Sequence, residues 1–170
     1  MNFHHISVLL NECLDGLAIR PDGTYLDCTL GGAGHSSEIV KRLGENGRHF
    51  GIDRDADAIM AATARIENMH APAHFQAIRG NFHDAKMLLE NAGVSGVDGI
   101  LADLGVSSHQ LDVRERGFSY HDEAPLDMRM DQSQPLSAYE IVNSWSEDEL
   151  NRILRDYGEE NWARQIKHKP

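Results

Sequence analysis

The stretch Asp-Cys-Thr-Leu-Gly-Gly-Ala-Gly-His, residues 27–35, decides the fold of this 170-residue chain. It follows a short apolar segment, and three of its nine residues are glycine. Glycine lets a strand-to-helix turn adopt a positive φ and lets a ligand approach the backbone closely. A tight turn without a ligand is the alternative, but three glycines beside an acidic residue favour a binding loop.

Three classes of ligand compete for this loop. A triphosphate-binding loop requires Gly-Lys followed by Ser or Thr, and that motif is absent here. A dinucleotide fingerprint requires GxGxxG, whereas residues 31–34 read Gly-Gly-Ala-Gly without a third glycine at the required offset. S-adenosylmethionine has no phosphate to bind and needs close backbone approach together with an acidic neighbour. The loop therefore favours S-adenosylmethionine as the cofactor.

Strands and helices are expected to alternate outward from the loop. The expected strands cover residues 25–28, 48–53, 74–78 and 99–103, and the expected helices cover residues 7–18, 36–43, 58–66 (capped by Asp55) and 82–91. This cadence is typical of parallel βαβ units, with helices on both faces of an open sheet. The pattern predicts an α/β, Rossmann-like core with four strands, which is fewer than such sheets usually contain.

The character of the sequence changes after residue 103. Residues 104–136 are polar and lack periodicity, and the chain then becomes helical again, with a capping box at Ser146 and Glu149 and a hydrophobic staple at Trp145 and Leu150. We expect a cofactor-binding core over residues 1–112, a linking loop over the site at 113–136, and the start of a helical insert at 137–170.

Two acidic residues at strand ends are candidate site residues. Asp53 ends the second strand about twenty residues after the loop, where a carboxylate can bind both hydroxyls of a ribose. A solvated turn is the alternative for Asp53. Asp103 is expected to end the fourth strand at the heart of the sheet, where a carboxylate is costly unless it faces a polar site. Phe82 follows the third strand, where an adenine-stacking role and an ordinary core role are equally consistent with the pattern.

Composition narrows the classes of function. The formal charge of −11 opposes direct binding of a polyanion but suits a cationic small molecule such as a sulfonium. The sequence contains no apolar run long enough to span a membrane and no leader pattern, so we expect a cytoplasmic protein. The ten histidines and two cysteines are scattered, which does not support a metal site.

Six groups of residues together carry a family resemblance: 5–12, 27–35, 53–55, 103–108 with 110–112, 116–119 and 125–131. They span nearly the whole chain, up to about Ile166, and the strings at 103–108 (Asp-Leu-Gly-Val-Ser-Ser) and 125–131 (Pro-Leu-Asp-Met-Arg-Met-Asp) are long and unusual. These strings resemble the bacterial 16S ribosomal RNA cytosine-N4 methyltransferases, the MraW family.

The resemblance implies a site and a substrate. By it, the cofactor contacts would be Ala33, Gly34, His35, Asp53, Phe82, Asp103 and Gln110. The family methylates N4 of a cytidine in 16S rRNA within the small ribosomal subunit, which requires the base to leave its stack. Asp103 is the candidate catalytic residue and the Leu104-Gly105 backbone is the alternative, because Leu-Gly stands where amine methyltransferases usually carry two prolines. Family members are close to twice as long, so we expect weak cofactor binding and little activity from 170 residues.

Three other functions fit parts of the sequence. An NAD-dependent oxidoreductase would use the same loop but lacks GxGxxG and a recognisable set of hydride-transfer residues. A methyltransferase acting on another amine, in DNA or protein, shares the local chemistry. A truncated binding module would retain the fold without turnover.

Overall fold

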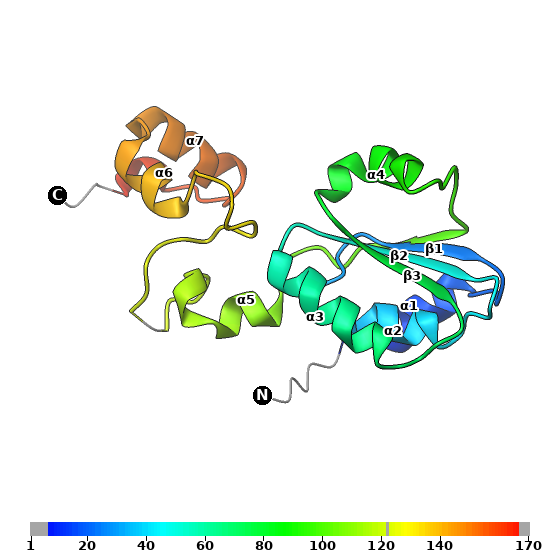
Figure 1. Cartoon of the computed structure of the whole chain (residues 1–170). Helices are drawn as coiled ribbons and strands as arrows, with labels where there is room; N and C mark the ends of the chain where they lie inside the picture. Colours follow the sequence, from blue (N-terminus) through cyan, green and yellow to red (C-terminus); the bar gives the residue numbers. More distant parts are fainter. Residues whose placement is uncertain (1–6, 122, 167–170) are drawn as a thin grey trace. The chain divides into compact units, whose positions relative to one another are not determined.

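The computed structural model describes residues 7–121 and 123–166, which form two compact units, one up to Ser108 and one from His109 onward (Figure 1). The first unit contains α1 (Leu10–Leu17), β1 (Thr24–Asp27), α2 (Gly34–Val40), β2 (Arg48–Asp53), α3 (Ala56–Glu67), β3 (His74–Arg79), a 3-10 turn (Phe82–Asp84), α4 (Ala85–Asn91) and β4 (Gly99–Leu101). Strands and helices thus alternate as the sequence predicts.

The four strands are parallel and lie in the order β3-β2-β1-β4. Doubly wound nucleotide-binding sheets begin in this order, and their ligands bind at the carboxyl ends of the strands. The predicted α/β, Rossmann-like fold class is therefore confirmed. In register, Leu26 of β1 is flanked by Phe50 of β2 and Ile100 of β4.

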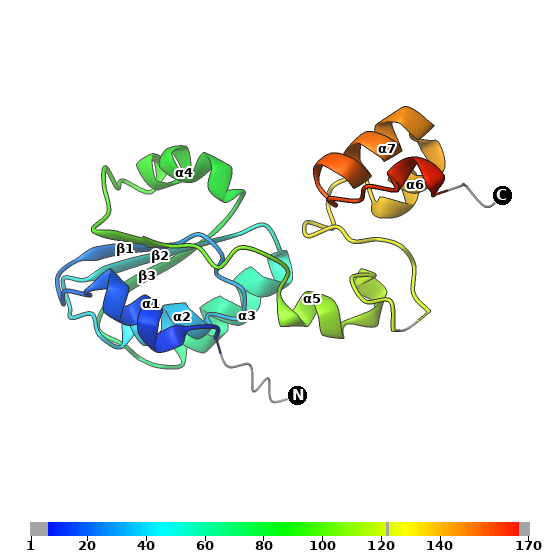
Figure 2. The ribbon, with the colours of Figure 1, turned by 180° about the vertical axis from the view of Figure 1, so that it is seen from behind.

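Helices cover both faces of the sheet, as expected for right-handed crossovers. Figures 1 and 2 show α1, α2 and α3 on one face and α4 on the other. The α4 side buries a cluster of Leu26, Cys28, Phe50, Ile52, Leu89 and Val94. The opposite side buries two clusters, which include Val40 with Ala62, and Tyr25 with Ile39. These clusters hold the strand ends, and hence the loops that follow them, in fixed positions.

Helix ends in this unit follow local chemistry. Asp55 accepts a hydrogen bond from the Asp57 amide at 3.1 Å and so caps α3, as predicted. The helix expected from residue 82 begins only at Ala85. Asn81 accepts a hydrogen bond from the His83 amide at 3.0 Å, and this contact sets up a 3-10 turn ahead of α4.

The second unit contains α5 (Ser108–Asp112, which begins at its border), a 3-10 turn (Arg114–Arg116), α6 (Ala138–Ser144), α7 (Glu147–Asp156) and a final 3-10 turn (Ala163–Gln165). The predicted capping box of α7 is confirmed, since Ser146 and Glu149 bond reciprocally. A second capping box, Ser137 with Glu140, begins α6 and was not predicted. In the described part of the chain, no helix has the length and apolar character that crossing a membrane requires.

Candidate functional site

The glycine-rich bend between β1 and α2 is held by Asp53. Gly31 has a φ of 48° and donates its amide to Asp53 Oδ2 at 2.8 Å. Asp53 Oδ1 accepts the Asp55 amide at 2.9 Å. Each carboxylate oxygen can accept a second hydrogen bond, and Asp53 is partly exposed at the end of β2. The predicted pairing of this carboxylate with the bend is therefore present in the structure, with acceptor capacity left for a ligand.

Asp103 lies beside the same loop. Its amide donates to Thr29 Oγ1 at 2.8 Å, which ties the segment after β4 to the segment after β1. The expectation that Asp103 closes a strand at the heart of the sheet is wrong, however. β4 ends at Leu101, forms the edge of the described sheet, and leaves Asp103 exposed. Because the edge strand has one partner only, its ladder stops earlier than the apolar pattern suggests.

Three residues of the predicted cofactor set lie at the start of α2. Ala33 has no exposed surface and a φ of 59°, and His35 is buried with its Nε2 3.0 Å from the Val8 carbonyl oxygen. A Cβ added to Gly34 would meet Ser7 Oγ at 2.0 Å. Ala33 and His35 are therefore buried within the protein, whereas Gly31, Gly32 and Gly34 retain accessible surface in the bend.

Phe82 and Gln110 complete the predicted set. Phe82 begins the 3-10 turn after β3 and is 44% exposed, so it is not the ordinary core aromatic of the alternative reading. Gln110 is buried in α5, within the second unit. The roles of all seven residues in cofactor binding remain predictions.

A buried polar network lies beneath the bend. The Asp27 carboxylate accepts hydrogen bonds from the Thr29 amide at 3.0 Å and from Ser36 Oγ at 2.7 Å. His49 Nε2 lies 2.7 Å from the same Ser36 hydroxyl. Burial raises the pKa of Asp27, and these hydrogen bonds oppose the rise. Burial and the Asp27 charge likewise raise the pKa of the neighbouring Cys28 thiol.

Sequence reasoning missed Ser36 and His49. Both are fully buried polar residues, and each lies at a position where the helix or strand pattern expects an apolar side chain. That mismatch was the available signal, because buried polar groups require partners. Nothing local indicates that Ser36 bonds Asp27 at the end of β1, or that His49 bonds Ser36.

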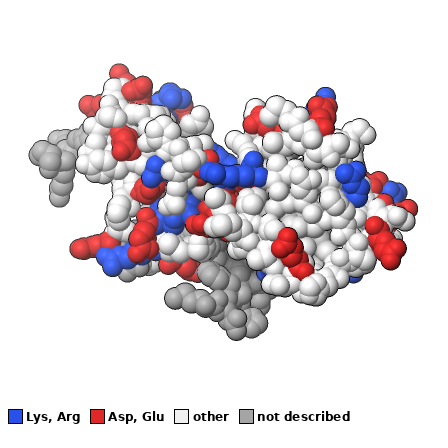
Figure 3. Space-filling model, in the orientation of Figure 1, with Lys and Arg blue, Asp and Glu red and all other residues white. Residues whose placement is uncertain are grey.

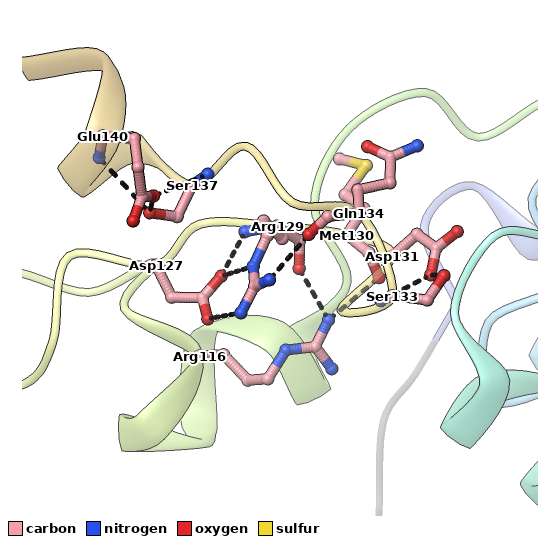
Figure 4. A network of polar contacts seen from close by, with 9 residues as sticks. All are labelled: Arg116, Asp127, Arg129, Met130, Asp131, Ser133, Gln134, Ser137 and Glu140. Carbon is pink, nitrogen blue, oxygen red and sulfur yellow. Dashed lines mark hydrogen bonds and ion pairs between the residues drawn. The ribbon is translucent and has the colours of Figure 1, made fainter. Parts of the chain in front are cut away.

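The motif strings of the second unit form one packed network (Figure 4). Arg116 donates to the carbonyls of Arg129 and Met130 at 3.0 Å each. Asp127 binds Arg129 through both oxygens, at 2.8 Å from Nε and 2.7 Å from Nη2. Gly117 has a φ of 69°, and a Cβ there would meet the Pro125 carbonyl at 2.3 Å. The strings at 116–119 and 125–131 are therefore packed against one another.

Charged side chains of both signs lie around the bend. Asp27 and Asp53 are the last residues of β1 and β2, Asp103 lies two residues beyond β4, and the Arg65 guanidinium donates to the Gly32 carbonyl at 2.9 Å. On the face drawn in Figure 3, the Lys and Arg residues of the described chain lie singly or in small groups among Asp and Glu. The described residues contain no group of three or more His, Cys, Asp and Glu arranged to hold a metal ion.

Comparison with known proteins identifies relatives of this chain. Ribosomal RNA small subunit methyltransferase H of Clostridioides difficile is 55% identical over 166 residues, covering 98% of this chain and 53% of its own length. The protein of the same name from Symbiobacterium thermophilum is 50% identical, with 98% and 52% covered. The chain thus spans about half the length of these relatives.

One solved structure, titled a putative rRNA-methylase from Clostridium thermocellum, superposes with a TM-score of 0.44 at 22% identity, covering 49% of this chain and 48% of that one. The family profile described as the MraW methylase family matches residues 2–169. The chain therefore belongs to the MraW methylase family.

Proposed function

We propose that this protein binds S-adenosylmethionine at the bend between β1 and α2 and takes part in methylating N4 of a cytidine in 16S rRNA of the small ribosomal subunit, in the cytoplasm. The observation that carries the proposal is the bond from the Gly31 amide to Asp53 Oδ2, at 2.8 Å. It places a carboxylate with spare acceptor capacity against an accessible glycine backbone, in a chain that belongs to a methylase family.

The residues present fit this cofactor. Asp53 retains lone pairs for the two ribose hydroxyls, and Phe82, partly exposed after β3, offers a flat apolar face for adenine. The neighbouring carboxylates favour the positive charge of the sulfonium by Coulomb attraction. When bound, the cofactor supplies an electrophilic methyl group.

The chain's own role in transfer is to orient the acceptor amine. The lone pair of an exocyclic amine is delocalised into its ring, so an acceptor that binds the N–H groups polarises the amine toward attack. Asp103 is exposed beside the bend and carries a carboxylate that can do this. We assign it that role within the proposal.

Binding is tested on this chain by ¹H–¹⁵N NMR during titration with S-adenosylhomocysteine, which detects affinities as weak as millimolar. We expect the amide signals of residues 31–34, 53 and 103 to shift. Asp53→Asn should reduce the affinity by about tenfold or more, because it replaces an ionised acceptor. Asp22→Asn, an exposed turn residue, is the matched control.

Two results would contradict the cofactor assignment. One is an absence of shifts at the bend, and the other is an equal response to NADH, which would favour the oxidoreductase alternative. The substrate is tested separately with tritiated S-adenosylmethionine and unmethylated small subunits, using the C. difficile relative as a positive control. Label in N4-methylcytidine is expected from the relative and, at a much lower level, from this chain, whereas label in protein or DNA would favour another amine substrate.

A further inference from the structure

A side-chain hydroxyl continues the contact between β1 and β4 beyond the end of the sheet. The Cys28 amide donates to the Leu101 carbonyl at 2.8 Å, as in an ordinary parallel ladder. Two residues beyond the end of β4, the Asp103 amide donates instead to Thr29 Oγ1 at 2.8 Å. The position of Asp103 relative to the bend thus depends on a side chain.

The Thr29 side chain is itself held in place. Its hydroxyl lies 3.3 Å from Asp27 Oδ1, to which it donates, and its amide donates to the same oxygen at 3.0 Å. A hydroxyl has one proton and can accept at the same time. Donation to Asp27 therefore leaves the oxygen's lone pairs directed toward the Asp103 amide.

Asp27 is fixed from its other side by two elements. Ser36 of α2 donates its hydroxyl proton to Asp27 Oδ2 at 2.7 Å, so His49 of β2 must donate Nε2–H to Ser36. Asp27 is 1% exposed, and Ser36 and His49 are not exposed at all. The support beneath Thr29 is therefore buried and shared by β1, α2 and β2.

We propose that Thr29 is a positioning residue, whose hydroxyl sets where Asp103 lies relative to the glycine-rich bend. The inference deepens the proposed function and rests on it for the role of Asp103. The turn at Thr29 does not itself need the hydroxyl, because the Thr29 amide makes the bond to Asp27 that closes the turn. Removing the hydroxyl therefore tests positioning separately from loop formation.

The test compares Thr29→Val and Thr29→Ala, which remove the hydroxyl, with Thr29→Ser, which keeps it. Thr63→Val is the matched control, because the Thr63 hydroxyl donates to the Ile59 carbonyl within α3 at 2.8 Å. Amide hydrogen exchange at Asp103 is measured by NMR in the 170-residue chain. We expect exchange about two- to tenfold faster in T29V and T29A, and unchanged in T29S and T63V.

Affinity for S-adenosylhomocysteine is the second measurement. T29V and T29A should weaken it by about two- to tenfold, with T29S close to wild type. Unchanged Asp103 exchange in both T29V and T29A would overturn the proposal, as would equal acceleration across the whole sheet, which indicates general destabilisation. If the wild-type chain bound no cofactor, the proposed function would fail, and the exchange at Asp103 would still decide whether Thr29 positions it.

Discussion

His49 lies in β2 and its side chain is fully buried. Its imidazole ring stacks on the Phe75 ring, with 5.8 Å between the ring centroids. Burial lowers its pKa from 6.5 to about 4, and the Tyr25 backbone opposes the shift only in part. Between these pH values the unfolded chain binds a proton that the folded chain does not. Stability from this group is therefore complete above pH 6.5 and is lost as the pH falls toward 4.

His49→Gln is predicted to flatten this pH dependence, because glutamine keeps an N–H donor for Ser36 but does not titrate. The full shift corresponds to about 3 kcal/mol in the free energy of unfolding. Urea unfolding of the wild type and of H49Q from pH 7.5 to 4 measures how the free energy of unfolding depends on pH. Subtracting one curve from the other cancels the contribution of Asp27, which has the opposite sign because its pKa is raised. Parallel curves for the two proteins would refute the assignment.

Gly34 is required for packing rather than for backbone conformation. A Cβ at this position would meet Ser7 Oγ at 2.0 Å and Ser7 Cβ at 3.4 Å. Gly34→Ala is predicted to lower the free energy of unfolding by about 1–3 kcal/mol. Adding Ser7→Ala should restore most of the loss, since it removes the closest atom.

Thermal unfolding of the two single variants and the double variant measures this coupling. Gly32→Ala is the control within the same bend, because a Cβ there would meet nothing within 4 Å. Equal effects of G34A and G32A, or additive effects of G34A and S7A, would show that Ser7 does not fill the space beside Gly34.

Among the elements, α7 begins with a capping box that satisfies backbone amides of its first turn. Ser146 accepts the Glu149 amide, and Glu149 accepts the Ser146 amide at 2.9 Å. Ser146→Ala is predicted to cost about 1 kcal/mol in the stability of the second unit. Ser144→Ala is the control, because that hydroxyl donates to the Glu140 carbonyl inside α6 and satisfies no free helix end. Circular dichroism during denaturation compares them, and an equal cost would exclude capping as the cause.

The sequence predicted elements best where local chemistry alone defines them. β2 was located to the residue, and the caps at Asp55 and Ser146 follow from side-chain type and spacing. The capping box of Ser137 and Glu140 follows the same spacing rule and lies directly after the polar segment that ends at residue 136. The strand predicted over residues 99–103 ends two residues earlier in the structure, at Leu101. The length of an edge strand depends on its one partner strand and not on its own apolar pattern.

In the candidate site too, some residues could be predicted from local sequence and others could not. The bend and Asp53 are visible in sequence, because glycines and an acidic strand end are unusual together. The contacts of Thr29, Ser36 and His49 join residues up to 74 positions apart. Only the strand order β3-β2-β1-β4 brings them together, and no local pattern specifies which hydroxyl meets which carboxylate.

At the scale of the whole molecule, the formal charge of −11 has opposite effects on binding of the cofactor and binding of RNA. The negative field favours a sulfonium but repels phosphates. We predict that the chain binds a naked 16S rRNA fragment with a Kd weaker than about 100 µM at 0.15 M salt, outside the usual range for nucleic-acid-binding proteins. Affinity should also lack the steep decrease with salt that results from counterion release.

Fluorescence anisotropy with a labelled rRNA fragment tests this prediction when salt is varied from about 0.05 to about 0.5 M. Over this range the Debye length falls from about 14 Å to about 4 Å, so electrostatic attraction would be progressively screened. A substrate presented within the small subunit can offer protein surfaces as well as phosphates, so binding to intact subunits should exceed binding to naked RNA. Micromolar binding to the naked fragment that weakens steeply with salt would instead require a basic surface on this chain, and the argument from net charge would fail.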